Sequence, residues 1–468
     1  MSELPETENH TQKSKKLPQF VAVLLATIAS FSIGTYLSWT SPALPLYNKN
    51  GTLFISDQEG SWICALLPAG AIVGTVPAGI LADKFGRKKT ICILSVLLLT
   101  CWLPISFAQT VNWIYLGRFV AGVSSGAVSV VIPIYASEIA DDSIRGALGT
   151  IFQLQITIGI LYAYISGLIG DVIGMSMFCA AIPALLLMVC PLLPESPVWL
   201  IREGRKEEAH YAIRKLRGQY YRTDDELNKL ENNLTSQGDR VTFLDLIQYK
   251  KALIITLGLM VFQQLSGVNT LIFYAEKIFK TAGSSLSSTI SSVIVGIVQV
   301  IATYFSTILI DRTGRKFLLF VSASVMSICM FTLSGYFHFQ NEHDVSKFAW
   351  IPLLSFAVFI IIFSVGFGPI PWLMVGELFT NNAKSTASSI TAITNWTLAF
   401  FVTKCFQDMV DIMGISSSFA TFGMISLFGT LFVTTMVPET KGKTIEEVQI
   451  ELYGFVQEPP SVGPKTQT

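Results

Sequence analysis

The chain has 468 residues, of which 51% are hydrophobic and only 14% are charged. Because about a quarter of the residues in soluble domains are charged, this composition excludes an ordinary soluble protein. The 32 basic residues balance the 32 acidic ones, so the chain lacks the excess positive charge that attracts nucleic acid.

Twelve uncharged stretches along the chain are each about long enough to cross a bilayer. A transmembrane helix needs roughly 20 such residues to span a hydrocarbon core of about 30 Å, and its backbone polar groups must be satisfied within the helix. The stretches cover residues 17–48, 60–82, 90–117, 119–137, 146–170, 172–194, 252–275, 281–310, 317–341, 348–376, 385–403 and 412–438. They predict an all-α integral membrane protein of twelve transmembrane helices, with the lipid bilayer around it.

Lysine and arginine gather in alternate loops between the stretches, which predicts that both termini are cytoplasmic. The basic loops include 84–89 and the long segment 195–251, where Thr223 begins a capping box ahead of helically spaced leucines. The predicted parts are a cytoplasmic N-terminus (1–16), an N-terminal six-helix bundle (17–194), a cytoplasmic helical linker (195–250), a C-terminal six-helix bundle (251–438) and a cytoplasmic tail (439–468).

Three pairs of sequence marks indicate that the two bundles are repeats of one another. Asp83-Lys-Phe-Gly-Arg-Lys-Lys89 returns as Asp311-Arg-Thr-Gly-Arg-Lys316, and Pro194-Glu-Ser-Pro197 returns as Pro438-Glu-Thr440. In the third pair, a glutamate precedes a basic residue by seven positions in each half. A tight glycine turn with anchoring charges would explain one such mark, but not three pairs in one order. The order predicts two six-helix halves related as parallel repeats.

The charged residues at the ends of these spans have two interpretations. One is that they anchor the loops in water. The other is that carboxylates pair with basic side chains across the faces of the two halves, lock the cytoplasmic side shut and separate when it opens. We favour the second, because Glu138 and Glu377 each lie at a span end beside a basic cluster. The residues of this predicted network are Asp83, Arg87, Glu138, Arg145, Asp311, Arg315, Glu377 and Lys384.

Glycine and proline mark two further features inside the spans. Gly70-x-x-x-Gly74 and Gly122-x-x-x-Gly126 are patterns that let helix backbones approach closely. The seventh and tenth stretches are interrupted, at Gly267 and at Gly366-Phe-Gly-Pro-Ile-Pro-Trp372. Broken helices at matching places in a repeat protein indicate a substrate site.

No catalytic or metal-binding pattern accompanies these features in the sequence. Six of the seven cysteines fall inside apolar stretches, Cys405 follows one by two residues, and none has a Cys-x-x-Cys spacing, which argues against a zinc site or a disulfide framework. No acid/base pair suggests an enzyme. We therefore expect no catalytic activity, no cofactor or metal, and no obligate protein partner.

Motifs spread over residues 20–445 carry a resemblance to a known family. They are the two Asp-x-x-Gly-Arg-Lys copies, Gly117-Arg-Phe119, Pro133-Ile-Tyr-Ala-Ser-Glu138, Arg145-Gly146, Pro194-Glu-Ser-Pro197, Gln263-Gln-Leu-Ser-Gly-Val-Asn269, Gly368-Pro-Ile-Pro-Trp372 and Pro438-Glu-Thr440. In this order they resemble the sugar porters of the major facilitator superfamily. Thr40-Ser-Pro-Ala-Leu44 and Ser61-Trp-Ile63 look most like insect facilitated trehalose transporters and related glucose carriers. The resemblance implies a rocker-switch transporter with a sugar site midway between the halves.

The resemblance also implies which residues bind the sugar. Carried over position by position, they are Gln153, Gln263, Gln264, Asn269, Gln299 and Asn395, with Trp372 against the sugar ring. Amides supply both donors and acceptors and carry no charge that would be costly in the membrane. A lone membrane amide more often bonds a neighbouring helix, but six amides on four spans favour a binding site. Phe273, Ser364 and Ala399 depart from the family pattern and leave the sugar's identity open.

The mode of transport follows from a missing acid. Symporters of the family that the chain resembles carry an Asp in the first span, whereas 17–48 has none and has Gly34-Thr-Tyr36 at the matching place. We expect a facilitative uniporter of trehalose or a hexose such as glucose, at the plasma membrane. A proton-coupled symporter is the alternative, as is a non-transporting sugar sensor, although only the 28 residues 441–468 follow position 440. Asn50-Gly-Thr52 predicts a glycan at Asn50 on the outer side.

Overall fold

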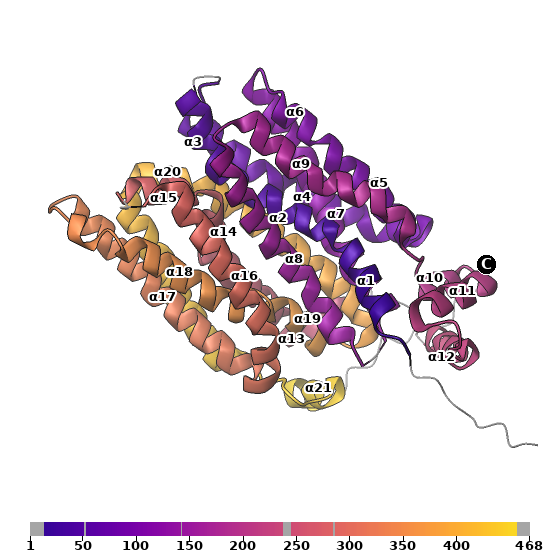
Figure 1. Ribbon diagram of the computed structural model, residues 1–468. Helices are drawn as coiled ribbons and strands as arrows, with labels where there is room; N and C mark the ends of the chain where they lie inside the picture. The colour runs from indigo at the N-terminus through magenta and orange to yellow at the C-terminus, as the bar shows by residue number, and fades with distance from the viewer. Residues whose placement is uncertain (1–13, 51–52, 142, 237–244, 284–285, 456–468) are drawn as a thin grey trace, which may run out of the picture.

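The computed structural model describes residues 14–50, 53–141, 143–236, 245–283 and 286–455, and these residues form helices without a strand among them (Figure 1). The helices of the first half of the chain, long and short, lie together in Figure 1 in indigo to magenta. They are α1 (Leu17–Ala26), α2 (Ile28–Ser38), α3 (Thr40–Asn50), α4 (Asp57–Phe85), α5 (Arg87–Thr100), α6 (Trp102–Ser106), α7 (Val111–Ile139), α8 (Arg145–Ser166), η1 (Gly167–Ile169), α9 (Val172–Val189) and η2 (Cys190–Leu192).

Three short helices follow, α10 (Pro197–Arg202), α11 (Lys206–Arg217) and α12 (Thr223–Ser236). Their apolar residues, among them Trp199 and Ile213, form a small core separate from the main one. Arg217 attaches them to the first half, because its Nη1 donates to the Ile139 carbonyl and its Nη2 pairs with Glu226, both at 2.8 Å. This linker lies at one end of the bundle, which we call the linker end.

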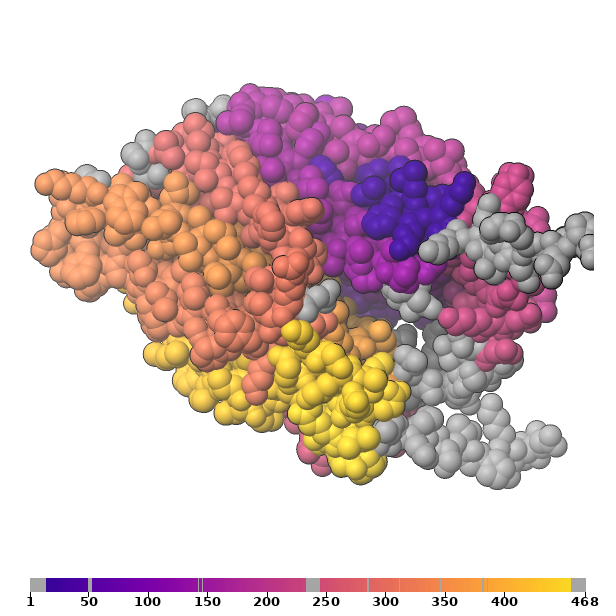
Figure 2. Space-filling model, turned by 60° about the horizontal axis from the view of Figure 1, so that its bottom comes forward, coloured from indigo at the N-terminus to yellow at the C-terminus, as the bar shows by residue number. Residues whose placement is uncertain are grey.

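The second half repeats the arrangement of long helices, in salmon to yellow in Figure 1. Its elements are η3 (Asp245–Tyr249), α13 (Lys250–Leu265), α14 (Val268–Phe273), α15 (Ala275–Thr281), α16 (Ser288–Thr313), α17 (Arg315–Gln340), η4 (Ser346–Phe348), α18 (Ile351–Val365), α19 (Ile370–Leu378), α20 (Asn381–Met436) and α21 (Ile445–Tyr453). Figure 2, turned toward the linker end, shows the two halves side by side.

Eleven helical segments of the described residues are long and apolar enough to cross a membrane. The last of them, Thr386–Met436, has 51 residues, about 75 Å of helix at 1.5 Å per residue and far more than one crossing needs. Its helix is interrupted at Gly414, where φ is 83° and ψ is 160°. Because this backbone breaks the helix into two lengths that can each span a bilayer, the segment supplies two crossings and the total agrees with the predicted twelve.

The third and fourth uncharged stretches, 90–117 and 119–137, are separated in the sequence only by Arg118, but no helix ends at that residue. The structure ends the third span at Ser106 and begins the fourth at Val111, so Arg118 lies within the fourth span. Arg118 is fully buried inside α7. Its Nε donates to the Ile63 carbonyl at 2.9 Å and its Nη1 to the Tyr36 carbonyl at 2.5 Å. Neighbouring helices therefore supply acceptors for two of its nitrogens, whereas Nη2 has no hydrogen-bond partner among the described residues.

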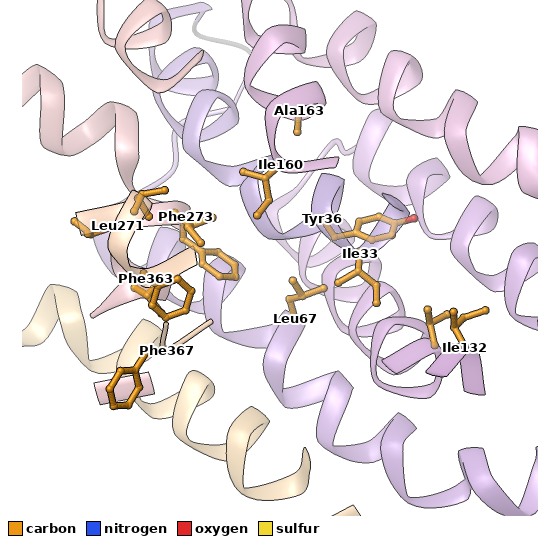
Figure 3. Packing of buried hydrophobic residues seen from close by; sticks show 14 of the residues in the cluster. Ile33, Tyr36, Leu67, Ile132, Ile160, Ala163, Leu271, Phe273, Phe363 and Phe367 are labelled. Carbon is orange, nitrogen blue, oxygen red and sulfur yellow. The ribbon is translucent and has the colours of Figure 1, made fainter. Parts of the chain in front are cut away.

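The glycine pairs of α4 and α7 bring these helices into close contact, as their spacing predicted. A Cβ at Gly74 would lie 1.9 Å from the Val123 carbonyl oxygen, and one at Gly126 would lie 2.1 Å from that of Ala71. Between the halves, α4 packs against α20 and α8 against α16. Phe273 of α14 lies among buried side chains of both halves (Figure 3), with the Arg118 guanidinium 5.9 Å from its ring.

Candidate functional site

A chain of four amide side chains, of which three are buried and one is half-buried, crosses the second half at the level where two helices are broken. Gln263 lies at the end of α13, and its Oε1 accepts a hydrogen bond from Asn395 Nδ2 of α20 at 2.7 Å. The same oxygen accepts from Gln264 Nε2 at 3.4 Å. Gln264 Oε1 in turn accepts from Asn269 Nδ2 of α14. Four of the seven predicted sugar-binding residues are therefore joined by hydrogen bonds.

The first helix break places Asn269 beside Gln264. α13 ends at Leu265, and Gly267 takes a left-handed conformation with φ at 85°. A residue with a Cβ is rarely found there, and a Cβ at Gly267 would also lie 2.7 Å from the Phe422 ring. The chain then re-enters a helix at Val268, so Asn269 is presented at the start of α14 instead of continuing the face of α13.

The second break supplies the partners of Gln263 Nε2. Phe367 lies between α18 and α19. Its carbonyl has no helical donor, because Pro371, four residues later in the first turn of α19, has no N–H. Gln263 Nε2 takes that place, donating to Phe367 O at 2.6 Å and to Gly368 O at 3.0 Å. The amide chain thus ties the broken seventh span to the broken tenth span.

The other three predicted residues are not hydrogen-bonded to this chain by any contact described. Gln299 of α16 is buried, and its Oε1 has no hydrogen-bond partner among the described residues. Gln153 of α8 is half-buried. Trp372 of α19 is 39% exposed, so it does not pack inside the core.

At the linker end, each half carries its own charge network. In the first half, Arg87 Nη2 pairs with Glu138 at 2.7 Å and its Nη1 pairs with Asp83 at 3.1 Å. Ser196 Oγ also donates to Glu138, at 2.5 Å. Glu195 Oε1 accepts from the backbone N–H of Arg87, at 2.9 Å, which fixes the start of α5.

The second half repeats the pattern with the matching residues. Arg315 Nη2 pairs with Glu377 at 3.0 Å, and Thr440 Oγ1 donates to Glu377. Glu439 accepts from the backbone N–H of Arg315 at 2.9 Å and from that of Lys316 at 3.1 Å. The repeat inferred from sequence therefore extends to individual hydrogen bonds.

The sequence predicted that these carboxylates pair across the faces of the two halves when the cytoplasmic side is shut, and the pairs seen in this structure lie within each half. Both Glu138 and Glu377 pair with an arginine of their own half, because the Asp-x-x-Gly-Arg-Lys turn brings that arginine next to the neighbouring span end. Lys384 is exposed. The side chains of Arg145, Asp311 and Asn50 lie outside the described residues.

The opposite end of the bundle joins the halves through residues that the sequence analysis did not single out. Lys277 Nζ pairs with Asp57 at 2.6 Å and donates to Gln407 at 2.9 Å, and Gln58 Nε2 donates to Asp408 at 2.7 Å. These residues, together with Lys404, form what we call the opposite-end latch. The sequence signal that could have predicted this latch is the set of acidic and basic residues that flank the spans at this end.

Backbone contacts beneath the latch also cross between the halves. Thr40 Oγ1 of α3 donates to the Phe273 carbonyl at 3.3 Å, and Tyr164 of α8 donates to the Ile272 carbonyl at 3.0 Å. The accepting carbonyls belong to α14, the helix that follows the break at Gly267. The halves are therefore closed on each other between the amide chain and the opposite end.

Two six-helix halves, closed at one end around broken helices that carry polar side chains, define a membrane transporter of the major facilitator type. The chain belongs to the sugar (and other) transporter family, whose match covers residues 17–452. This is a family of transporters and not of enzymes. The predicted fold class and family are thereby confirmed.

Two curated relatives and one solved protein illustrate the similarity. The chain is 38% identical to facilitated trehalose transporter Tret1 of Aedes aegypti, over 95% of this chain but 56% of the relative. Tret1 of Culex quinquefasciatus is also 38% identical, over 95% of this chain and 88% of the relative. The chain thus spans little more than half the length of the first relative and most of the second.

The solved protein is the xylose transporter XylE from E. coli. Its inward-open structure is 25% identical and gives a TM-score of 0.78, covering 92% of this chain and 99% of that one. XylE is also described as a proton:xylose symporter in a complex with 6-bromo-6-deoxy-D-glucose, which gives a TM-score of 0.75 over 93% of this chain and 100% of that one.

Proposed function

We propose that this protein is a facilitative uniporter for trehalose or a hexose such as glucose, working by alternating access at the plasma membrane. The observation that carries the proposal is the chain of uncharged amides, Gln263, Gln264, Asn269 and Asn395, at the two broken helices. In this proposal the linker end faces the cytoplasm, the opposite end faces outward, and the structure is an inward-facing state.

The chemistry of the amide chain suits a sugar. Each amide offers two N–H donors and an oxygen with two lone pairs, which matches hydroxyl groups that both donate and accept. A carrier with millimolar affinity holds its substrate by only about 4 kcal/mol, so a few net hydrogen bonds are sufficient. Gln299, whose buried Oε1 has no partner among the described residues, offers one more acceptor.

Uniport is favoured by the absence of an acid where a proton would have to be carried. No Asp or Glu lies in the middle of any apolar stretch of the sequence, whereas coupled transport of a proton needs an ionisable group in the path. The similarity to XylE, described as a proton:xylose symporter, is the specific observation in favour of the alternative, proton-coupled symport.

The two alternatives differ in the endpoint of uptake. In transport-null cells that express this chain, a radiolabelled substrate that is not metabolised should equilibrate to equal concentrations inside and outside at any external pH. The panel of substrates should include trehalose and glucose. Accumulation several-fold above the external level that collapses with an uncoupler would establish symport instead. Absence of uptake for every sugar would contradict a transport role.

A further inference from the structure

Glu276 is a buried carboxylate that the transport site does not use. It lies in α15, three residues beyond the end of the seventh span at Phe273, and only 4% of its surface is exposed. Its Oε1 has no hydrogen-bond partner among the described residues. Because burying a charge without a partner is costly, this position needs a physical explanation.

The walls around Glu276 come from both halves of the protein. On the first half, Ser41 Oγ of α3 accepts a hydrogen bond from the Glu276 backbone N–H at 3.1 Å. On the second half, the Thr289 hydroxyl of α16 lies near the carboxylate and lowers its pKa. Gly167 of the first half contacts both walls, because a Cβ there would be 2.7 Å from Pro42 of α3 and 3.3 Å from Thr289 of α16. Glu276 therefore lies at the seam that must separate when the outer side opens.

The basic groups near this seam are engaged elsewhere or turned to solvent. On α15 itself, Lys277 pairs with Asp57 and Gln407 of the latch, and Lys280 is exposed. Of the helices packed against α15, α14 has no ionisable residue, and the charged residues of α16 are Asp311 and Arg312. These follow Thr289 by more than 20 residues, about 30 Å along the helix.

The remaining ionisable groups that face the seam come from the first half. On α3 they are Tyr47, which donates to the Ile105 carbonyl at 3.3 Å, and Lys49, whose side chain is outside the described residues. On α8 it is Tyr164, which is occupied by the Ile272 carbonyl. None of the described side chains around Glu276 places a positive charge against its carboxylate.

We propose that Glu276 is a proton-binding site of the outer gate, which takes a proton from the external solution when the halves close over it and returns it there when they open. Closure then buries a neutral carboxylic acid in place of a carboxylate. The inference rests on the alternating access of the proposed function and adds a ligand, the proton, to its outer gate. Because the site lies on the outer side of the amide chain, the proton leaves by the side it entered, and no proton crosses the membrane.

Burial raises the pKa of Glu276 to about 7 in this closed state, and the nearby Thr289 hydroxyl opposes that rise. In an open gate the carboxyl would be in water, where the pKa of a glutamate is about 4.3. Relative to the open gate, the closed gate is therefore most stable below about pH 4.3. It loses that stability as the pH rises through about 7, the pKa of Glu276 in the closed state. Between these values the ratio of closed to open gate should fall by up to about tenfold per pH unit.

The test measures gate opening directly on the purified full chain, without sugar. Spin labels on Asn112→Cys and Asn341→Cys, exposed on the outer side of the two halves, report the distance across the gate. The exposed Cys405 is replaced by serine in this background. From pH 5 to pH 7 the ratio of open to closed gate should rise at least tenfold in the otherwise wild-type protein. Glu276→Gln, which mimics the protonated acid, should hold the acidic ratio at every pH.

Two further variants separate the proposal from a general effect of pH. Glu342→Gln, which removes an exposed carboxylate on the same side, should keep the wild-type response. Glu276→Asp should still titrate. A ratio that stays within twofold from pH 5 to pH 7, or Glu276→Gln titrating like wild type, would overturn the proposal. Because no sugar is present, this result is independent of the accumulation assay that decides between uniport and symport.

Discussion

Gln263 holds two broken helices together and also belongs to the candidate sugar site. Its Nε2 satisfies the carbonyls of Phe367 and Gly368, which would otherwise be buried without a donor. Asn269 is half-buried, and the hydrogen bond of its side chain goes to its near neighbour Gln264. At the scale of single residues, these two amides of one site should therefore respond differently to truncation.

We expect Gln263→Ala to lower both thermal stability and uptake, whereas Asn269→Ala should mainly weaken sugar binding. Leaving buried carbonyls unsatisfied costs about 1–3 kcal/mol each. Losing hydrogen bonds worth about 0.5–1.5 kcal/mol to the sugar should raise half-saturation roughly two- to tenfold. The Tm of the purified variants and the concentration dependence of uptake measure the two effects. Gln248→Ala, exposed in η3, should change neither, and unchanged half-saturation in both site variants would remove them from the site.

At the scale of helices, α4 can pack closely on α7 because it has glycine, without a side chain, where the two backbones meet. Gly74 has no room for a side chain, since a Cβ would come within 1.9 Å of the Val123 carbonyl. Five residues along the same helix, a Cβ at Gly79 would meet nothing within 4 Å. The chain thus offers a matched pair of glycines, one required by packing and one not.

Gly74→Ala should force the two helices apart and sharply lower the amount of folded protein, because the atoms that the new Cβ would meet are backbone atoms of Val123, which cannot move aside. Gly79→Ala should leave stability unchanged or raise it by up to about 1 kcal/mol, the gain in helix propensity. Size-exclusion chromatography after a heating series measures both. Equal stability of the two variants would mean that α4 and α7 are not in the close contact described here.

At the scale of the whole molecule, the proposed orientation puts the loop after α3 outside and the linker helices inside. The sequons at Asn50 and Asn233 fall on these two sides, and the side chains of both lie outside the described residues. Only a sequon that reaches the lumen of the secretory pathway can be glycosylated. Asn50 should therefore carry the glycan and Asn233 should not.

A glycosidase-sensitive shift on a gel should vanish in Asn50→Gln and persist in Asn233→Gln. Both variants should retain uptake, because neither residue lies near the amide chain in sequence or in the proposed site. A glycan on Asn233 would reverse the proposed orientation and place the linker outside. It would also place Glu276 on the cytoplasmic side, which would reverse the side from which its proton comes.

Much of the fold and part of the site could be predicted before the structure. The lengths of the apolar stretches and the repeated Asp-x-x-Gly-Arg-Lys turns gave the number of spans and the two halves, because both are local properties of the chain. The Gln263–Asn269 motif identified amides that the structure joins to Asn395. The charge of Arg118 does not end a span, because its guanidinium is buried and donates hydrogen bonds to carbonyls of neighbouring helices.

Sequence by itself determined which segments enter the membrane, that the halves are repeats, and which polar residues lie in the broken spans, because apolar length, charge and helix-breaking residues act on the nearby chain. Only the tertiary structure decided which residues contact each other. Glu138 pairs with Arg87 of its own half and not with a basic residue of the other half. Gln263 donates to the Phe367 carbonyl, which Pro371 leaves without a helical donor, and Glu276 is buried where the halves close. Such partners lie many residues apart in the chain, and hydrogen bonds and burial depend on distances in space that no local pattern contains.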